Sequence, residues 1–215
     1  MSSSREFLRN TYDLAYEAYA RKFVNELDHK PLDRELLKQF AALVGGERPV
    51  LDIGCGPGHT TAHLTNLGLM ATGVDLSPKM VEIASRTFPQ SRFEVGDFFA
   101  LPRASSSIAG IIAFYCIVHL TPEQLVPAFS EMFRVLNVGG VLLLSFHVGS
   151  EVVRAENFLE TNVVLDFTFF EPQQIEAALR TVGFDSIDVR IRASYDIEYP
   201  SRRCYVFAHK LPSMA

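Results

Sequence analysis

Short apolar runs alternate with amphipathic stretches through most of the chain, and their order predicts a parallel β-sheet covered by helices. Beyond residue 49, each run of Val, Ile and Leu is followed by a segment whose apolar residues recur at helical spacing. Strands of nearly continuous Val, Ile and Leu are typical of parallel sheets buried on both faces. The predicted strands span 50–54, 70–75, 92–97, 108–115, 140–147, 185–193 and 203–210, and the predicted helices span 60–68, 77–88, 121–136 and 171–183.

Capping signals mark where several of these helices begin and end. Ser77 and Thr121 each stand just before a proline, as expected of an N-cap followed by proline at the first helical position. Towards the N-terminus, Pro31 divides a helical region, Asp33 is expected to cap its second helix, and the glycines at 45–46 are expected to end it.

The pattern predicts one α/β domain over residues 1–215. Residues 1–46 form an N-terminal helical extension, 47–147 carry the strand–helix alternation, and 148–215 contain an irregular Val- and Phe-rich stretch followed by a helix and two closing strands. There is no internal repeat or low-complexity linker to divide the chain.

Composition excludes several classes of protein. Apolar residues make up 48% and charged residues 21%, and the net charge of -5 argues against a general nucleic-acid surface. No apolar run reaches the roughly 18 residues of a membrane span, so no membrane partner is expected. The start, "MSSSREFLRN", lacks the apolar core of a secretory signal, and three widely spaced cysteines are typical of free thiols in a reducing compartment. A cytoplasmic protein is expected.

A glycine-rich turn follows the first predicted strand. Gly54, Gly56 and Gly58 stand at every second position, and ligands of doubly wound sheets bind beyond the carboxyl ends of the strands. Glycine permits positive φ and removes the Cβ that keeps a ligand from the backbone. Asp75 ends the next strand, and an acid about 20 positions beyond such a turn can accept hydrogen bonds from ribose hydroxyls. Together these features indicate a ligand that contains ribose.

The spacing then separates two classes of ribose ligand. Dinucleotide sites usually read G-x-G-x-x-G, whereas this turn reads G-x-G-x-G and follows Asp52. A carboxylate there repels pyrophosphate but suits the ammonium group of an amino acid. Asp97 ends the third strand and is expected near the adenine edge. Ribose, adenine and an amino-acid tail describe S-adenosylmethionine, and a dinucleotide oxidoreductase stays open as the less favoured alternative.

Five segments in order carry a family resemblance. The chain between residues 50 and 144 reads "VLDIGCGPGHTT", "GVDLSPKMVEIA", "FEVGDFFALP", "IIAFYCIVHL" and "EMFRVLNVGGVLLL", and it resembles class I S-adenosylmethionine-dependent methyltransferases. It is most similar to the small-molecule branch that includes the ubiquinone/menaquinone-biosynthesis methyltransferases. The resemblance implies a Rossmann-like, seven-stranded, mostly parallel sheet with an antiparallel last strand and helices on both faces.

The resemblance also implies roles for individual residues, with S-adenosylmethionine as cofactor and S-adenosylhomocysteine as its product. The implied cofactor-binding set comprises Gly54, Gly56, Gly58 and Asp52 at the methionine end, Asp75 on the ribose, Leu76, Met80, Asp97 and Phe98 around the adenine, and Tyr12 and Tyr19 as covering residues. Local packing or capping is the alternative explanation of the acids, of Met80 and of the tyrosines.

Two residues near the end of the fourth strand are the candidate catalytic residues. The resemblance places Tyr115 where substrate and sulfonium meet, and His119 is positioned to act as a general base on a neutral hydroxyl or amine. A structural His119 is the alternative, and His147 is a second candidate base. His59 and His63 stand four apart but have no third ligand nearby, so no metal site is expected.

The expected activity is methyl transfer by in-line displacement to an O, N or C nucleophile of a small molecule. The fourth strand reads "AFYC" in place of the Asp/Asn-Pro-Pro-Tyr pattern of base-amine methyltransferases, so no nucleic-acid acceptor is expected. The apolar stretch 149–170 hints at a hydrophobic acceptor. Arg190, Arg192, Arg202 and Arg203 either face an anionic acceptor or form a solvated strand surface. The alternative is a catalytically silent S-adenosylmethionine-binding protein that acts through a partner; a monomer and a homodimer are both open, as is the acceptor's identity.

Overall fold

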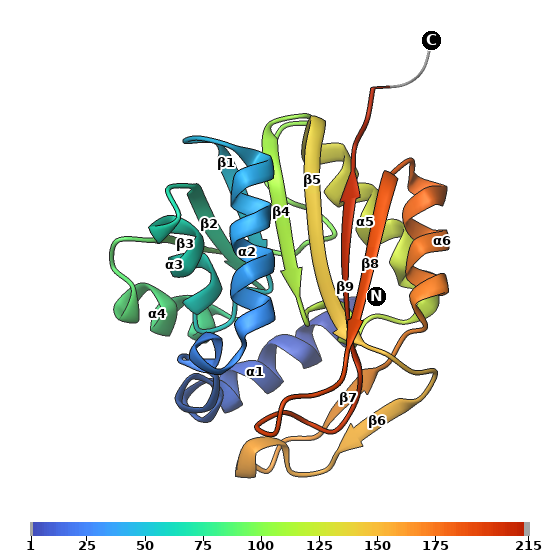
Figure 1. The fold of residues 1–215 in the computed structure, drawn as a ribbon. Helices are drawn as coiled ribbons and strands as arrows, with labels where there is room; N and C mark the ends of the chain where they lie inside the picture. The colour runs from blue at the N-terminus through green and yellow to red at the C-terminus, as the bar shows by residue number, and fades with distance from the viewer. Residues whose placement is uncertain (1, 213–215) are drawn as a thin grey trace.

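The computed structural model describes residues 2–212 and shows a central sheet between two layers of helices (Figure 1). The sheet has seven strands, as the apolar pattern predicted, and their order is β3-β2-β1-β4-β5-β9-β8. The strands are β1 (Pro49–Ile53), β2 (Met70–Asp75), β3 (Arg92–Val95), β4 (Ile108–Phe114), β5 (Leu136–His147), β8 (Asp185–Arg192) and β9 (Arg203–His209).

Strand directions confirm the expected mixed sheet. The five strands from β3 to β5 run parallel, and β9 is antiparallel to both of its neighbours, β5 and β8. The chain leaves β1 in one direction to build β2 and β3 and returns on its other side to build β4. This reversal of strand order places the default ligand crevice beside the carboxyl end of β1.

Helices cover both faces of the sheet and bury its apolar side chains. From α2, Leu36 and Phe40 pack on one face, whereas Phe129 of α5 and Ile175 of α6 belong to the core on the other. The helices are α1 (Ser2–Phe23), α2 (Pro31–Val44), α3 (His59–Asn66), α4 (Pro78–Thr87), α5 (Pro122–Val135) and α6 (Pro172–Val182), with 3-10 segments η1 (Glu26–His29), η2 (Ile117–His119) and η3 (Phe158–Glu160).

The predicted caps Ser77 of α4, Thr121 of α5 and Gly45 at the end of α2 are confirmed, whereas the N-cap predicted for α2 is wrong. Ser77 caps α4 by accepting a hydrogen bond from the Met80 N–H at 3.1 Å. The expectation that Asp33 caps α2 is wrong, because α2 begins at Pro31 and Asp33 lies inside it, 1% exposed. Its carboxylate accepts a hydrogen bond from the Tyr205 hydroxyl of the last strand, β9, at 2.8 Å, and does not cap the helix.

Two segments outside the main sheet lie at the carboxyl end of its parallel strands (Figure 1). One is α1, which crosses beneath the strand ends. The other is an antiparallel hairpin of β6 (Val152–Ala155) and β7 (Leu165–Thr168), built from the stretch in which the pattern predicted no regular structure. Within residues 2–212 no helix combines the length and apolar character that a bilayer span requires.

Gly58 is required by packing as well as by backbone conformation. It is the N-cap of α3 with φ +87°, and a Cβ built on it would lie 2.7 Å from the Phe93 ring and 2.8 Å from the Ala84 methyl. Gly68 has the same φ of +87° but has open space where a Cβ would stand. A side chain at Gly68 would therefore cause backbone strain alone, whereas one at Gly58 would cause the same strain together with steric overlap.

We expect Gly58→Ala to lower the free energy of unfolding by about 2–4 kcal/mol, the sum of left-handed strain and overpacking. Gly68→Ala is the matched control and carries only the strain, about 1–2 kcal/mol. Urea denaturation of both variants measures the difference. Equal losses at the two positions would contradict the packing role of Gly58.

Candidate functional site

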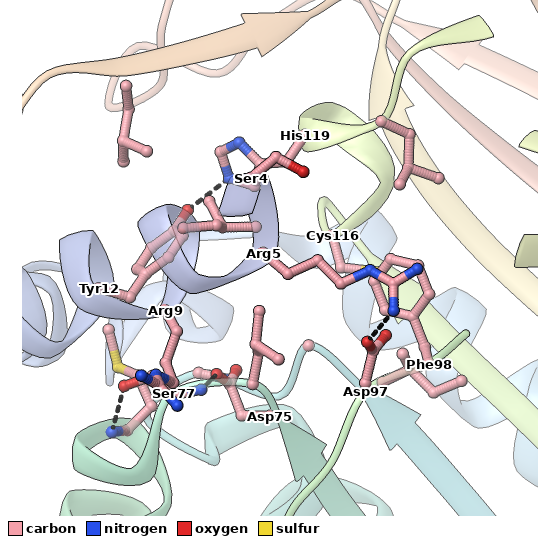
Figure 2. A pocket seen from close by; sticks show the side chains of 18 of the residues that line it. Ser4, Arg5, Arg9, Tyr12, Asp75, Ser77, Asp97, Phe98, Cys116 and His119 are labelled. Atoms are coloured by element: carbon pink, nitrogen blue, oxygen red, sulfur yellow. Dashed lines mark hydrogen bonds and ion pairs between the residues drawn. The ribbon is translucent and has the colours of Figure 1, made fainter. Parts of the chain in front are cut away.

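The carboxyl ends of β1 to β4 and helix α1 enclose a cavity of about 550 Å³ (Figure 2). Each strand end contributes to it, as the parallel topology requires, and α1 closes the opposite side. Ligand pockets usually measure about 300–1,000 Å³. Of the predicted cofactor-binding residues, those lining this cavity are Tyr12, Tyr19, Gly54, Gly56, Asp75, Leu76, Met80, Asp97 and Phe98.

Asp75 is held at the mouth of β2 by two backbone donors. Its Oδ2 accepts the Gly56 N–H at 2.8 Å and its Oδ1 accepts the Ser77 N–H at 2.9 Å. Burial raises the pKa of Asp75 to about 6, while these two donors lower it. Each carboxylate oxygen keeps a further lone pair, so Asp75 can accept two more hydrogen bonds from a ligand in the cavity.

The three glycines of the turn have different structural roles. All have positive φ, but a Cβ at Gly54 would overlap Cys116, whereas one at Gly56 would meet only the Tyr19 ring, at 3.4 Å. Gly54 and Gly56 line the cavity, and Gly58 does not. Close approach of a ligand to the backbone therefore concerns Gly54 and Gly56, and packing accounts for Gly58.

Asp52 lies beneath the turn and outside the cavity lining. It is 2% exposed, and its Oδ2 accepts a hydrogen bond from the Thr61 hydroxyl at 2.6 Å. Burial raises the pKa of Asp52 to about 6, against the effect of the Thr61 bond. In this position Asp52 holds the start of α3 against β1, so a role at the amino-acid end of a ligand stays a prediction and is indirect.

Asp97 is engaged by the N-terminal helix. Arg5 of α1 donates to Asp97 Oδ2 at 2.6 Å (Figure 2). Its guanidinium also covers the Phe99 ring at 4.4 Å, and Asp97 Oδ1 accepts the Phe99 N–H at 2.9 Å. The Phe98 and Phe99 rings stack at 5.0 Å. Asp97 could bind an adenine edge only if its ion pair with Arg5 broke.

His119 joins α1 to the β6–β7 hairpin. Its Nδ1 lies 3.1 Å from the Asp166 carbonyl oxygen, which can only accept, so Nδ1 carries the proton. The Tyr12 hydroxyl then donates to Nε2 at 2.7 Å (Figure 2). Burial lowers the pKa of His119 to about 4, so the ring is neutral near pH 7.

Tyr115 lies where the first cavity meets a second one, of about 670 Å³. Tyr12, Tyr19 and Tyr115 line both cavities. Tyr115 has φ +53°, a conformation that non-glycine residues adopt rarely and that is enriched at functional sites. Burial raises the pKa of its hydroxyl to about 12, so Tyr115 can donate a hydrogen bond but is no base at neutral pH.

The contacts that hold α1 across the cavity were missed by sequence reasoning, apart from Tyr12 and Tyr19. Asp13 accepts hydrogen bonds from the Ser77 hydroxyl at 2.5 Å and from the Lys79 N–H at 3.1 Å, at the start of α4. Arg5 reaches Asp97, 92 positions away in the sequence. No local pattern marks such pairs, because neither partner departs from an ordinary surface residue.

Comparison with known proteins finds a family match for the part of the chain that supplies the strand-end cavity. Residues 50–140 match the family model described as a methyltransferase domain. This stretch runs from the start of β1 into β5 and contains the glycine turn, Asp75, Asp97 and His119.

Individual curated relatives match a longer part of the chain than the family model does. A demethylmenaquinone methyltransferase of Chlorobaculum parvum is 31% identical over 146 residues, which is 65% of this chain and 59% of that protein. The chain spans about half the length of the first curated relatives it matches.

Solved structures share the fold across nearly the whole chain. DhpI, solved in complex with SAH, has a TM-score of 0.76 at 20% identity and is covered 99% by 99% of this chain. Phosphoethanolamine N-methyltransferase 2 of Haemonchus contortus, solved with phosphomonomethylethanolamine and S-adenosylhomocysteine, has a TM-score of 0.75 at 20% identity over 97% of this chain and 61% of that one. At these identities the likeness shows the fold.

The lowered pKa of His119 predicts a pH-dependent stability. An unfolded histidine titrates near 6.5 and the folded His119 near 4, so the unfolded state binds the extra proton between these values. The contribution of His119 is therefore complete above about pH 6.5 and is lost as the pH falls towards 4. The raised pKa values of Asp52 and Asp75 act in the opposite direction, so a comparison with a variant is needed to isolate His119.

We expect wild type to lose about 1–3 kcal/mol more unfolding free energy than His119→Gln between pH 6.5 and pH 4. Urea denaturation at a series of pH values measures both proteins, and the effects of the aspartates and of His147 cancel in the difference. Parallel stability profiles for the two proteins would show that His119 is not held neutral by the fold.

Proposed function

We propose that the protein transfers the methyl group of S-adenosylmethionine to a small-molecule acceptor by in-line displacement. The observation that carries this proposal is the environment of Asp75, which faces the cavity with one backbone donor on each oxygen and one acceptor site left on each. Two vicinal ribose hydroxyls match these two sites. The methyltransferase-domain match over residues 50–140 supports the same ligand.

The rest of the cavity fits the other parts of S-adenosylmethionine. Leu76 and Met80 provide apolar surface beside Asp75, and Phe98 continues it towards the end of β3, where the adenine would lie. Gly54 and Gly56 bring backbone without side chains to the cavity below Tyr19, where the methionine part would lie. Bound there, S-adenosylmethionine supplies a methyl group already activated by its sulfonium.

The protein's own contribution is then mainly alignment and exclusion of water. Because the donor is activated, holding acceptor and methyl in line can supply several kcal/mol of barrier reduction. Tyr12, Tyr19 and Tyr115 stand at the junction of the two cavities, so they would flank the path of transfer. The left-handed backbone of Tyr115 aims its ring at this junction from the end of β4.

His119 is the group best placed to remove a proton from the acceptor. Its Nε2 is the unprotonated nitrogen, and the Tyr12 hydroxyl occupies it in this structure. An acceptor hydroxyl or amine that replaced Tyr12 as donor would place its proton on Nε2, and the Asp166 carbonyl would keep the ring oriented. The low pKa of His119 makes it a weak base, which suits an acceptor that becomes acidic only as its bond to carbon forms.

Titration with S-adenosylhomocysteine tests the proposal. We expect wild type to bind it with micromolar affinity and Asp75→Ala to bind roughly 100-fold more weakly, because two hydrogen bonds to a charged acceptor are lost. Asp188→Ala, which removes an exposed carboxylate on β8, is the control and should bind like wild type. NAD, titrated in parallel, should not bind. Tight binding of NAD, or no binding of S-adenosylhomocysteine to folded wild type, would refute the proposal.

The raised pKa of Asp75 predicts how this affinity varies with pH. Protonation removes one of the two free acceptor sites, so affinity for S-adenosylhomocysteine should fall as the pH drops through about 6. An Asp75→Asn variant should bind weakly at every pH and lack this titration. Calorimetry between pH 5 and 8 measures both profiles, and an unchanged wild-type affinity across that range would show that Asp75 does not contact the ligand.

Turnover separates the enzyme from the alternative of a silent binding protein. A folded protein that binds S-adenosylhomocysteine should transfer methyl groups to one member of a panel of small phenols, acids and amines. His119→Gln should lower kcat for that acceptor while leaving S-adenosylhomocysteine affinity within about twofold. Full activity of His119→Gln would remove the histidine from the proton-transfer role.

A further inference from the structure

The second cavity has aromatic walls and one polar side. The walls come from the β6–β7 hairpin and the loops around it, including Phe158, Phe167 and Phe169. We use "polar side" for Lys30, His147, Glu198 and Arg203, all of which line this cavity. None of these four side chains lines the strand-end cavity.

The polar side is continuous. Glu198 Oε1 lies 3.4 Å from Lys30 Nζ and 3.9 Å from Arg203 Nε. At its other end, Ser201 Oγ lies 2.7 Å both from Arg203 Nη1 and from His147 Nδ1. His147 and Arg203 are also direct cross-strand partners in β5 and β9, so two rigid strands fix their relative position.

The guanidinium of Arg203 is incompletely hydrogen-bonded, although Glu198 lies 3.9 Å from its Nε. Glu198 is bonded by Arg192 at 2.6 Å and 2.9 Å, and Lys30 pairs with Glu26 at 2.7 Å. Arg203 is 3% exposed and bonds only Ser201, through Nη1. Its buried Nε donates no hydrogen bond to any residue between 2 and 212 and has only the ion pair with Glu198 at 3.9 Å. A buried guanidinium with an unsatisfied donor on a cavity wall is expected to take an anionic partner.

His147 adds a neutral donor beside Arg203. Ser201 Oγ accepts from Arg203 and lies 2.7 Å from His147 Nδ1; in the tautomer in which the Ser201 hydroxyl donates to Nδ1, the ring proton lies on Nε2. Nε2 has no hydrogen-bond partner in the described chain. Burial, with the positive charges of Arg203 and Lys30, lowers the pKa of His147 to about 3, which keeps it neutral.

The surrounding rings select the shape of what binds there. Phe169 stacks on His147 at 4.7 Å with only 11° between the ring planes, and Tyr199 meets both rings edge-on. Phe158 and Phe167 lie on the hairpin side, close to Tyr12 and His119. Flat aromatic surfaces of this kind pack best against another flat apolar body.

We propose that the methyl acceptor is a flat aromatic molecule with an oxyanion group, a carboxylate or a phosphate, that binds Arg203 and His147 with Lys30 nearby. This inference rests on the proposed function, because it places the acceptor in the cavity that shares three tyrosines with the cofactor cavity. The opposite end of the acceptor then lies at Tyr115, where the methyl group would arrive.

We call the binding position beside Arg203 and His147 the oxyanion seat. Three probes of similar size test it: benzoate, phenyl phosphate and the neutral benzamide. Calorimetry or ligand-observed NMR measures their binding at millimolar concentration, with and without saturating S-adenosylhomocysteine. We expect at least one of the two oxyanions to bind about tenfold or more tightly than benzamide. The tighter of benzoate and phenyl phosphate identifies which oxyanion the acceptor carries.

Variants assign the selectivity to Arg203. Arg203→Gln should abolish the preference for the oxyanion and leave benzamide binding unchanged, whereas Arg190→Gln should retain the preference, because Arg190 is a partly exposed arginine on the neighbouring strand β8. If thermal melting shows that Arg203→Gln is unfolded, Arg203→Lys replaces it, with a reduced preference expected from a smaller set of donors.

Outcomes for this seat and for the proposed function are separable. Equal binding of oxyanion and amide to wild type, no binding of either oxyanion, or a preference that survives in folded Arg203→Gln would overturn the oxyanion seat even if S-adenosylhomocysteine binds. Selective oxyanion binding without affinity for S-adenosylhomocysteine would support the seat and refute the proposed function.

Discussion

The hydrogen bonds of Asp75 are the constraint on which the strand-end site depends. One carboxylate receives an N–H from the turn after β1 and another from the turn after β2, so it ties together the two loops that frame the cavity. The Gly56 N–H points at Asp75 because the turn takes up left-handed conformations at Gly54, Gly56 and Gly58. A buried carboxylate is costly without such donors, so the glycine turn and the acid stabilise each other.

Helix α1 is joined to this rigid frame through polar contacts as well as through its buried alanines and tyrosine rings. Arg5 reaches Asp97, Tyr12 reaches His119, and Asp13 reaches the start of α4, while Phe7 and Leu14 of the same helix stay mostly exposed. Each such bond contributes only about 1 kcal/mol net. Two of these contacts involve Asp97 and His119, so α1 is coupled to the groups proposed to meet cofactor and acceptor.

The sequence was informative wherever structure follows from local pattern. Val, Ile and Leu runs predicted the seven strands, and Ser77 followed by proline predicted the start of α4, because both signals act within a few residues. The strand-end position of Asp75 followed from topology. The role of Asp33 was wrong, since a cap and a buried ion-pair partner look alike in sequence and Tyr205 stands 172 positions away. The β6–β7 hairpin was missed because each of its strands has only four residues, too few for an alternating pattern to stand out from the Val- and Phe-rich stretch around it.

That same buried Asp33 connects the fold to the chemistry of the second cavity. Arg192 bonds both Asp33 and Glu198, whereas Arg203 reaches Glu198 only at 3.9 Å, through Nε. Helix α2, strand β8 and the loop before β9 thus share one charge network, with Arg203 at its end on the cavity wall. Buried ion pairs contribute little net stability, because desolvation offsets their attraction. Their effect here is positional: the network holds a charged donor rigidly beside the aromatic walls, and that fixed position gives an acceptor cavity its selectivity.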